Sequence, residues 1–460
     1  MQQLISSYLT KRVPSSSLSV YRFFFGLLMC FSIIRFWHKG WIEELYLDPI
    51  FHFSYYGFEW IKPLGDYTYL IFFICFISSL FVCIGFRYRV SIIVFFLSFF
   101  YIEMMDKTTY LNHYYFISSL SFLMIFLPAN STFSIDNIIS KKSYPTIPKW
   151  SVDSIKLLIS IVYIYAAIAK MNSDWLFNAM PLKIWISSKY HFPFFGDTFF
   201  QQEWFYYFMS WAGMIYDLCI PFLLLYTRTR LIGFLLVIIF HISTKLLFPI
   251  GMFPYIMIFS AIIFFSPKIH NSIISQCLLV WNKIKGVFNI SYNTKIHLIN
   301  KVDKVYNSSV LYIILIFFLF QLLFPFRYMM YPGELFWTEQ GYRFSWRVML
   351  TEKTALTNFK IVDRDNQTFF YVNNSDFLTS FQEKQMSFQP DFILEYAHYL
   401  GDYFSNNNGD SVQVFADSYV SLNGRKSQKF IDNNIDLYLE KRSLKNKTWI
   451  IPFNDEITGF

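Results

Sequence analysis

The run VDSIKLLISIVYIYAAIAK occupies residues 152–170 and decides the fold class. Two charged residues lie near its start, and no charged residue lies between Leu157 and Ala169. A run of this length and hydropathy is typical of a helix that crosses the roughly 30 Å of hydrocarbon in a bilayer. The run ends at Lys170. We therefore predict a membrane-spanning helix that carries a lysine near one end.

Similar apolar runs recur on both sides of this one. We predict further spans at 18–36, 67–85, 90–105, 111–128, 203–226, 230–247, 250–266 and 309–326. Charged residues make up 15% of the chain, well below the roughly 25% of soluble domains. The N-terminus is polar and shows no cleavable signal peptide, and the five cysteines have no spacing that indicates disulfides or zinc. The sequence thus predicts a polytopic α-helical membrane protein with about nine transmembrane helices.

The loops between the predicted spans differ in charge. If the spans alternate, one side carries Lys11, Arg12, Arg87, Arg89, Lys141, Lys142, Lys149, Arg228, Arg230, Lys268, Lys283, Lys285, Lys295, Lys301 and Lys304. The short loops of the other side carry Lys39, Lys62, Lys107, Lys183 and Lys189. The positive-inside rule then places the N-terminus in the cytoplasm and the C-terminus outside. The net charge of +8 therefore indicates basic cytoplasmic loops and membrane lipid as a partner rather than nucleic acid.

The composition changes near residue 327. We expect residues 1–326 to form the transmembrane domain and residues 327–460 to form a β-rich extracytoplasmic domain. Alternating stretches at 360–362 and 412–415, separated by Asn- and Gly-containing turns, predict strands, and we expect a helix near 389–404. The chain is thus predicted to place a compact polar domain outside the membrane.

Ionisable and amide side chains within the predicted spans are the candidates for function, because such groups are costly in lipid. They are Asn112, His113, Lys170, Asp217, His241 and Lys245. On the predicted topology all of these except Asp217 lie near the outer face, the side that carries the polar domain. This shared depth of residues far apart in the chain is the main indication of a site.

Ordinary explanations stay open for each candidate. A lysine at a helix end can extend to the headgroups, and a membrane histidine can be a hydrogen-bonded packing residue. Asp217 is expected to pair with a neighbouring polar group such as a tyrosine hydroxyl. Desolvation beside the apolar end of the 152–170 run favours a neutral Lys170 amine, which could act as a base. Asp174, one turn further on, would favour the charged amine if it reached it.

Ordered motifs along most of the chain resemble those of the vitamin K-dependent gamma-glutamyl carboxylases, most closely the bacterial members. They are Tyr21-Arg22, Phe25-Gly26, Gly40-Trp41-Ile42-Glu43, residues 51–60 (FHFSYYGFEW), Asp106-Lys107-Thr108, residues 110–115 (YLNHYY), Ile161-Val162-Tyr163, residues 169–175 (AKMNSDW), His241, residues 248–254 (FPIGMFP), Tyr331-Pro332-Gly333 and residues 337–347 (WTEQGYRFSWR). Each motif is weak alone, but their order and spacing make the set specific.

The resemblance implies a reaction. Lys170 would deprotonate reduced vitamin K (phylloquinol or menaquinol), which reacts with O2 to give a strong base and leaves as the epoxide. That base would remove the γ-proton of a glutamate in a protein or peptide, and CO2 would add to the carbanion. Asn112 and His113 would hold or polarise the quinone oxygens, and His241 would contact the quinone. Trp337, Tyr342, Ser345 and Trp346 are our candidates for glutamate contacts.

Several features limit what the resemblance implies. Ala169 stands where many relatives have a second lysine, Asn172 replaces an aspartate of vertebrate members, and the C-terminal segment has no cysteine. Recognition of a propeptide is therefore not implied. We find no phosphate loop, metal-binding motif or serine-hydrolase elbow, so no ATP, biotin or metal is expected.

Two other functions stay open. A quinol epoxidase that does not carboxylate protein would need Lys170, Asn112 and His113 but not the residues around Tyr342 and Trp346. A non-enzymatic membrane transporter would place polar residues at the bilayer midplane in paired halves. A bacterial inner membrane is the expected location.

Overall fold

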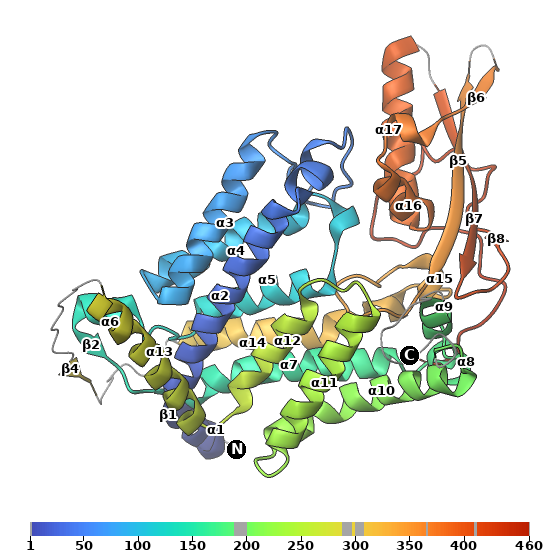
Figure 1. The fold of residues 1–460 in the computed structure, drawn as a ribbon. Coiled ribbons are helices and arrows are strands. Elements are labelled where there is room, and N and C mark those ends of the chain that lie inside the picture. The colour runs from blue at the N-terminus through green and yellow to red at the C-terminus, as the bar shows by residue number, and fades with distance from the viewer. Residues whose placement is uncertain are drawn as a thin grey trace.

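The structure is a computed structural model that describes residues 2–187, 200–287, 297–299, 308–364, 367–408 and 412–459. Its helices from α2 to α14 form one body, and a sheet with two covering helices stands at one end of that body (Figure 1). The polar segment that follows the last apolar helix is therefore gathered at one end of the molecule.

Six helices of the described residues are long and apolar enough to cross a membrane. They are α2 (Ser16–His38), α3 (Tyr67–Ile84), α7 (Lys149–Ala169), α10 (Glu203–Leu225), α11 (Arg230–Leu247) and α14 (Ser308–Leu323), the last extended by the 3-10 helix η4 (Phe324–Met330). A seventh crossing would combine two helices that meet at 117°, α12 with η3 (Phe253–Ala261 and Ile262–Phe264) and α13 (Pro267–Val287). The chain is therefore a polytopic membrane protein.

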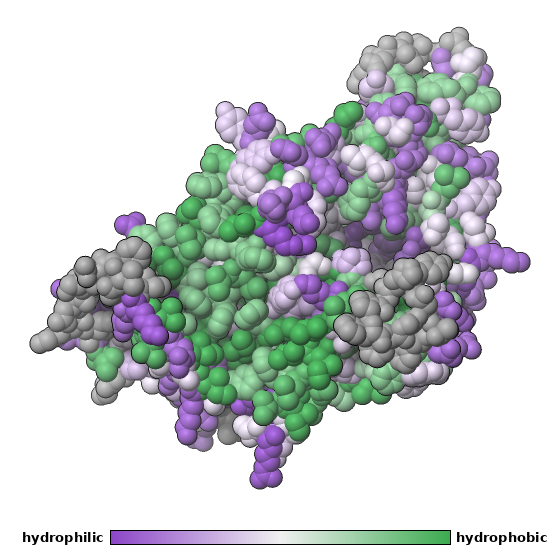
Figure 2. Space-filling view, in the orientation of Figure 1, coloured by the Kyte–Doolittle hydropathy of each residue, from purple (hydrophilic) through white to green (hydrophobic). Residues whose placement is uncertain are grey.

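Two further apolar helices are short. α4 (Tyr88–Met104) has 17 residues and α5 (Asn112–Ile125) has 14, fewer than the roughly 20 that usually span a bilayer. The predicted count of nine spans therefore stays a prediction. Figure 2 shows an extended hydrophobic surface over the helical body and hydrophilic surface over the C-terminal segment at the upper right. Exposed Leu231 and Ile239 of α11 and Leu315 of α14 are the kind of side chain that faces lipid.

The N-terminal helices pack closely for a reason visible in the sequence. α2 lies against α3, and a side chain at Gly26 would come within 2.4 Å of the backbone nitrogen of Cys83. Arg22 is buried and donates hydrogen bonds to the carbonyls of Val82 and Cys83 at the end of α3. Carbonyls in the last turn of a helix lack the usual partners further along it. Arg22 binds two of them, of which that of Val82 also accepts from the backbone N–H of Gly85 at 3.1 Å. The Tyr21-Arg22 and Phe25-Gly26 motifs thus fix one helix crossing.

Short strand pairs gather several loops at the end of the body opposite the sheet. β1 (Arg12–Pro14) pairs with β3 (Thr146–Pro148), and β2 (Lys142–Ser143) pairs with β4 (His297–Leu298). The remaining short elements are α1 (Gln2–Thr10), η1 (Glu43–Leu47), η2 (Lys107–Thr109), α6 (Ile135–Ser140), α8 (Ser173–Asn178), α9 (Leu182–Ser187), α15 (Leu335–Thr338) and η5 (Asn374–Asp376). The strand pairs thus bring three of the basic loops together.

The C-terminal segment contains a four-stranded sheet of order β6-β5-β7-β8. The strands are β5 (Lys353–Asp363), β6 (Phe369–Tyr371), β7 (Val412–Leu422) and β8 (Gln428–Lys429), and all pairs are antiparallel. α16 (Ser380–Ser387) and α17 (Pro390–Asn408) lie beside it, and buried residues alternate along β7. The strands expected at 360–362 and 412–415 and the helix expected near 389–404 are present. The division at 326/327 and the extracytoplasmic β-rich domain stay predictions.

Candidate active site

Lys170 lies immediately after α7, where that helix packs against α10. Its Nζ donates a hydrogen bond to Oδ2 of Asp217 at 2.7 Å, and both side chains are buried. Small residues in the last turn of α7 (Ala166, Ala167 and Ala169) permit this close approach of the two helices. Lys170 therefore does not extend to the headgroups but forms a buried ion pair.

The acidic partner of Lys170 differs from the one considered from sequence. Asp174 accepts hydrogen bonds from Arg425 on both carboxylate oxygens at 2.7 Å and another from Asn423 at 2.7 Å. Its carboxylate is thus engaged with the C-terminal segment and not with the Lys170 amine. Asp217 is the carboxylate that contacts Lys170, so it does pair with a neighbouring polar group as expected, although that group is a lysine amine and not a tyrosine hydroxyl.

The ion pair borders a cavity of about 80 Å³. Its walls come mainly from apolar side chains of α7, α10 and α11, and Val348 and Met349 of the C-terminal segment complete them. His241 lines the same cavity, and its Nε2 lies 3.0 Å from the hydroxyl oxygen of Tyr163. The structure thus brings Lys170 and His241 together.

His241 retains one unused hydrogen-bonding atom. Its Nδ1 is buried and has no hydrogen-bond partner in the part of the chain that the structure describes. A buried imidazole nitrogen without a partner is unfavourable, so a polar atom of a bound molecule would stabilise it. The cavity itself is smaller than the roughly 300–1,000 Å³ of ordinary ligand pockets. The cavity would therefore have to enlarge to admit a ring-sized ligand.

Asn112 and His113 lie beside this cavity, not among the described residues that line it. Asn112 donates from its side-chain nitrogen to the carbonyl of Arg347 at 2.8 Å. The ring of His113 lies 6.0 Å from that of Phe253, which in turn lies 5.5 Å from His241. One phenyl ring therefore separates the two histidines, and the roles expected for Asn112 and His113 stay predictions.

The segment expected to bind glutamate is largely buried. Trp337 is 0% exposed and donates its indole N–H to the carbonyl of Ile451 at 2.8 Å. The Ser345 hydroxyl donates to the carbonyl of Tyr342, and Trp346 packs with its ring 4.6 Å from that of Tyr115. Burial raises the pKa of Tyr342 to about 12, so its hydroxyl stays protonated at neutral pH. The glutamate contacts of these four residues stay predictions.

The loop that follows Tyr342 reaches towards the membrane helices. Phe344, Trp346 and Met349 have φ values of 57°, 60° and 54°, in the left-handed region that side-chain-bearing residues seldom adopt. Three such residues within six positions indicate a backbone held in an unfavourable shape by its surroundings. Because Phe344 borders a second cavity and Met349 borders that of Lys170, this loop connects two sites.

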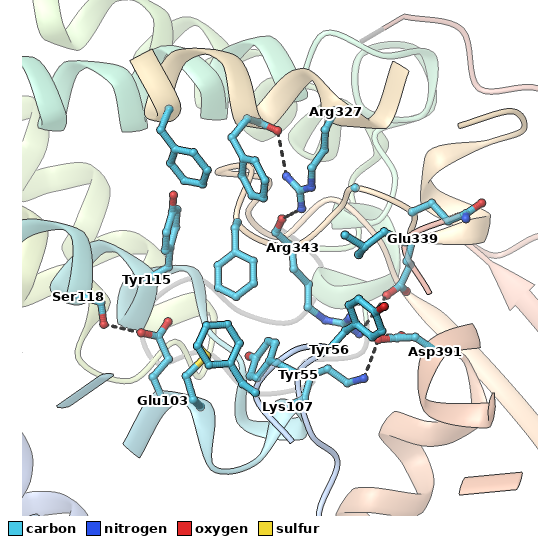
Figure 3. A pocket seen from close by; sticks show the side chains of 18 of the residues that line it. Tyr55, Tyr56, Glu103, Lys107, Tyr115, Ser118, Arg327, Glu339, Arg343 and Asp391 are labelled. Carbon is cyan, nitrogen blue, oxygen red and sulfur yellow. Dashed lines mark hydrogen bonds and ion pairs between the residues drawn. The ribbon is translucent and has the colours of Figure 1, made fainter. Parts of the chain in front are cut away.

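The second cavity has a volume of about 540 Å³ and lies between α4, α5, α14 and the C-terminal segment (Figure 3). Its membrane part is lined by Phe96, Phe100, Phe122, Phe317, Phe320 and Phe324 and contains Glu103. Its other end is polar and includes Lys107, Arg343 and Asp391. The sequence interpretation missed Glu103, although a single carboxylate inside the 90–105 run was a sufficient signal.

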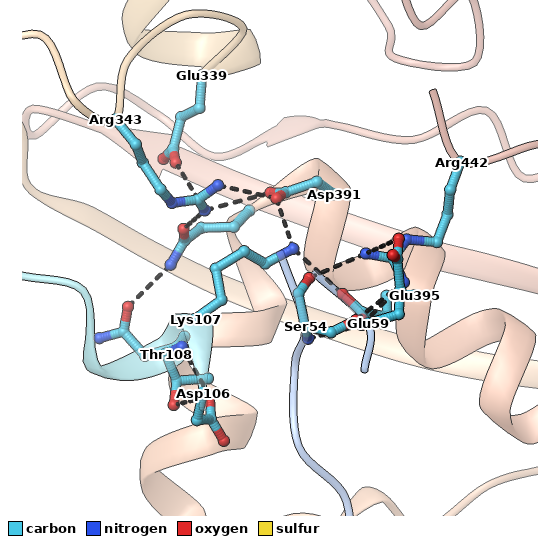
Figure 4. A network of polar contacts seen from close by, with 12 residues as sticks. Ser54, Glu59, Asp106, Lys107, Thr108, Glu339, Arg343, Asp391, Glu395 and Arg442 are labelled. Carbon is cyan, nitrogen blue, oxygen red and sulfur yellow. Dashed lines mark hydrogen bonds and ion pairs between the residues drawn. The ribbon is translucent and has the colours of Figure 1, made fainter. Parts of the chain in front are cut away.

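A polar network joins the membrane helices to the C-terminal segment beside this cavity (Figure 4). Lys107 Nζ lies 2.8 Å from Asp391 and 3.1 Å from Glu395, and Arg343 lies 2.8 Å from Asp391. Burial opposes ionisation of Asp391, but Arg343 and Lys107 outweigh it and hold its pKa well below the ordinary range. Glu395 also accepts hydrogen bonds from Ser54. This network fixes the C-terminal segment on the helical body.

The fold and site define an integral membrane protein that encloses a lysine ion pair beneath a loop of its polar segment. The HTTM domain model matches residues 10–268, which is more than half of the chain, and the model of the vitamin K-dependent gamma-carboxylase lumenal domain matches residues 306–456. The chain therefore belongs to the vitamin K-dependent gamma-carboxylase family. No solved structure matches it.

Proposed function

We propose that the protein is a vitamin K-dependent gamma-glutamyl carboxylase. It would couple oxidation of reduced vitamin K to the epoxide with conversion of protein glutamate to gamma-carboxyglutamate, using O2 and CO2. The observation that carries the proposal is the Lys170–Asp217 pair in an apolar cavity whose wall comes partly from the segment matching the lumenal domain. A metal, biotin or ATP has no part in this chemistry.

Lys170 is the proposed base. To accept a proton from a quinol hydroxyl the amine must be neutral, and Asp217 is the adjacent carboxylate that can hold its proton. The distance of 2.7 Å between Nζ and Oδ2 supports such a transfer. When bound, the reduced quinone supplies, with O2, the strong base that no side chain can provide. The apolar walls exclude water, which would quench that base.

Asn112, His113 and His241 are the proposed quinone contacts. The unpartnered Nδ1 of His241 fits a quinone oxygen, and Phe253 lies between the two histidines as an aromatic neighbour. Movement of the 344–349 loop would admit the ring and, on return, close the cavity. Trp337, Tyr342, Ser345 and Trp346 are the proposed glutamate region. Of these, Tyr342 lies between Gly341 and Arg343, which line the larger cavity.

The proposed topology has nine spans, with a cytoplasmic N-terminus and an extracytoplasmic C-terminal segment in a bacterial inner membrane. In this arrangement residues 1–326 form the catalytic membrane domain and residues 327–460 bind the glutamate substrate. Two strand pairs, β1 with β3 and β2 with β4, lie at the end opposite the sheet and support this assignment.

A quinol epoxidase without carboxylation is the second candidate. The burial of Trp337 and Trp346 favours it, because tryptophans that pack inside the protein are not free to contact a glutamate. This candidate requires the Lys170 cavity but not the glutamate region.

One experiment separates the candidates. Purified protein receives reduced vitamin K, bicarbonate with labelled carbon and a glutamate peptide, and the epoxide and the fixed label are measured separately. The carboxylase is expected to yield both products. Epoxide without label would support the epoxidase, and neither product in the presence of bound quinol would overturn both enzymatic functions.

A further inference from the structure

Glu103 is a buried carboxylate that the proposed reaction does not use. It lies near the end of α4, and its side chain borders the membrane part of the larger cavity (Figure 3). One carboxylate oxygen accepts a hydrogen bond from the Ser118 hydroxyl. The other oxygen, Oε1, is buried and has no hydrogen-bond partner among the described residues. Glu103 therefore presents one unused acceptor at this cavity.

Tyr55, which lines the same cavity, also has a buried hydroxyl without a hydrogen-bond partner among the described residues, whereas three other polar side chains nearby are paired with one another. The Tyr115 hydroxyl donates to Gln321 at 3.1 Å, and the Gln321 amide lies 3.3 Å from the hydroxyl oxygen of Ser119. Leaving a buried carboxyl oxygen without a hydrogen-bond donor is unfavourable. A hydrogen-bond donor on a bound molecule would offset that cost.

The surroundings of Glu103 restrict the class of that molecule. The walls are mostly phenylalanine rings, which suit an aromatic ring and an apolar chain. The polar end has the cations Lys107, Arg327, Arg343, Arg442 and Lys447, and the carboxylates around it, those of Glu59, Glu339, Asp391 and Glu395, already pair with cations, which disfavours entry of a cationic donor. Phospholipid acyl chains offer no donor at all. An aromatic alcohol with an apolar chain meets all three conditions.

We infer that the larger cavity is a second binding site for a lipid-soluble quinol, with Oε1 of Glu103 accepting a hydrogen bond from one ring hydroxyl. Its volume of about 540 Å³ is within the usual range for such ligands, whereas that of the Lys170 cavity is not. The inference rests on the proposed quinol chemistry. One loop borders both cavities, with Phe344 at the larger one and Met349 at that of Lys170. In this proposal the larger cavity holds the quinol before it reaches Lys170.

Glu103 also makes the cavity selective for the reduced form. A quinol offers two hydroxyl donors to the unpartnered Oε1, whereas the oxidised quinone has only acceptor oxygens and offers it none. In Glu103→Gln the Ser118 hydroxyl keeps the amide oxygen, so the amide N–H2 faces the cavity. That variant should therefore bind the oxidised quinone in preference to the quinol.

The test uses a naphthoquinol with a short apolar chain that carries a photoreactive group, bound to the full chain in phosphatidylcholine nanodiscs without oxygen. Cross-links are mapped by mass spectrometry for the reduced and the oxidised probe. In the unsubstituted protein the reduced probe should label α4, α5 and α14 as well as the residues around Lys170. Glu103→Gln should lower labelling of these three helices by the reduced probe about tenfold. Glu44→Gln, at an exposed position, is the control.

Three outcomes would overturn the second site. They are labelling by the reduced probe only beside Lys170, equal labelling of α4, α5 and α14 by both probe forms, and phospholipid that the quinol does not displace from the cavity. If Glu103→Gln does not fold, labelling of the unsubstituted protein by the reduced and the oxidised probe still tests whether the second site exists. Labelling of these helices without epoxide formation would contradict only the proposed function, and epoxide formation without that labelling would contradict only the second site.

Discussion

The protein buries two lysines near the same end of its helical body, and they differ in their partners. Lys170 has one carboxylate partner, Asp217, and borders an apolar cavity. Lys107 contacts two carboxylates, those of Asp391 and Glu395, and its Nζ lies 4.5 Å from the centre of the Phe392 ring. The first lysine has a single carboxylate partner besides a hydrogen bond to the Ala166 carbonyl, whereas the second belongs to a network that spans two parts of the chain.

This difference separates a functional from a structural ion pair. Lys107 contacts two carboxylates in one network, so its side chain can move only if several contacts break together. Lys107 is therefore held in one position. Lys170 has one ion pair and one longer hydrogen bond of 3.3 Å to the Ala166 carbonyl, so transfer of a proton to Asp217 frees the amine with fewer contacts to break. We therefore expect substitutions at Lys170 to affect the chemistry and substitutions at Lys107 to affect stability.

Lys170→Met should have the largest effect. Removal of the proposed base should lower the rate of epoxide formation at least about 100-fold, because a positioned base contributes roughly 10²–10⁴-fold. The rate is measured with reduced vitamin K in detergent, with folding checked by thermal unfolding. Full activity in this variant would refute the assigned base.

Lys107→Met, the same substitution at the other lysine, should mainly lower stability. Asp391 and Glu395 would lose a buried partner, and we expect a loss of about 2–4 kcal/mol in the free energy of unfolding. Unfolding in detergent measures this. A variant with unchanged stability would show that the network does not hold the C-terminal segment in place.

Asp217→Asn should have a smaller effect on activity than Lys170→Met. The amine would keep a polar neighbour but lose the carboxylate that orients it and takes its proton, so epoxide formation should fall about 10- to 100-fold. Asp174→Asn is the matched control, because Asp174 pairs with Arg425 and not with Lys170. An equal loss of activity per folded molecule in both variants would contradict the proposed role of Asp217 as the partner that orients the Lys170 amine and takes its proton.

The smallest expected effect concerns pH. Arg343 and Lys107 hold the pKa of Asp391 well below its ordinary value, so its stabilising contribution is present above about pH 4 and is lost only as the pH falls towards the lowered value. The difference in unfolding free energy between the unsubstituted protein and Asp391→Asn should therefore stay constant from about pH 8 to pH 5 and shrink below about pH 4. Asp376→Asn, at an exposed position, should show no such dependence. A difference that already declines between pH 8 and pH 5 would contradict the assignment.

Much of the fold follows from the sequence because hydropathy and periodicity act locally. The 152–170 run and its counterparts predicted the helices that the structure contains, and alternation predicted β5 and β7. The common depth of Lys170 and His241 followed from counting spans, and the two residues do line one cavity. The same counting predicted that depth for Asn112 and His113, yet Phe253 separates His113 from His241, since equal depth along a span does not imply contact.

The tertiary structure alone decided which charges meet. The sequence placed Asp174 four residues after Lys170, but packing of α7 on α10 pairs Lys170 with Asp217, and the C-terminal segment engages Asp174 through Arg425. The unpartnered oxygen of Glu103 likewise depends on the packing of α4, α5 and α14 around one cavity. Helices form from neighbours along the chain, whereas ion pairs and cavities form between residues that only the packing of helices brings together.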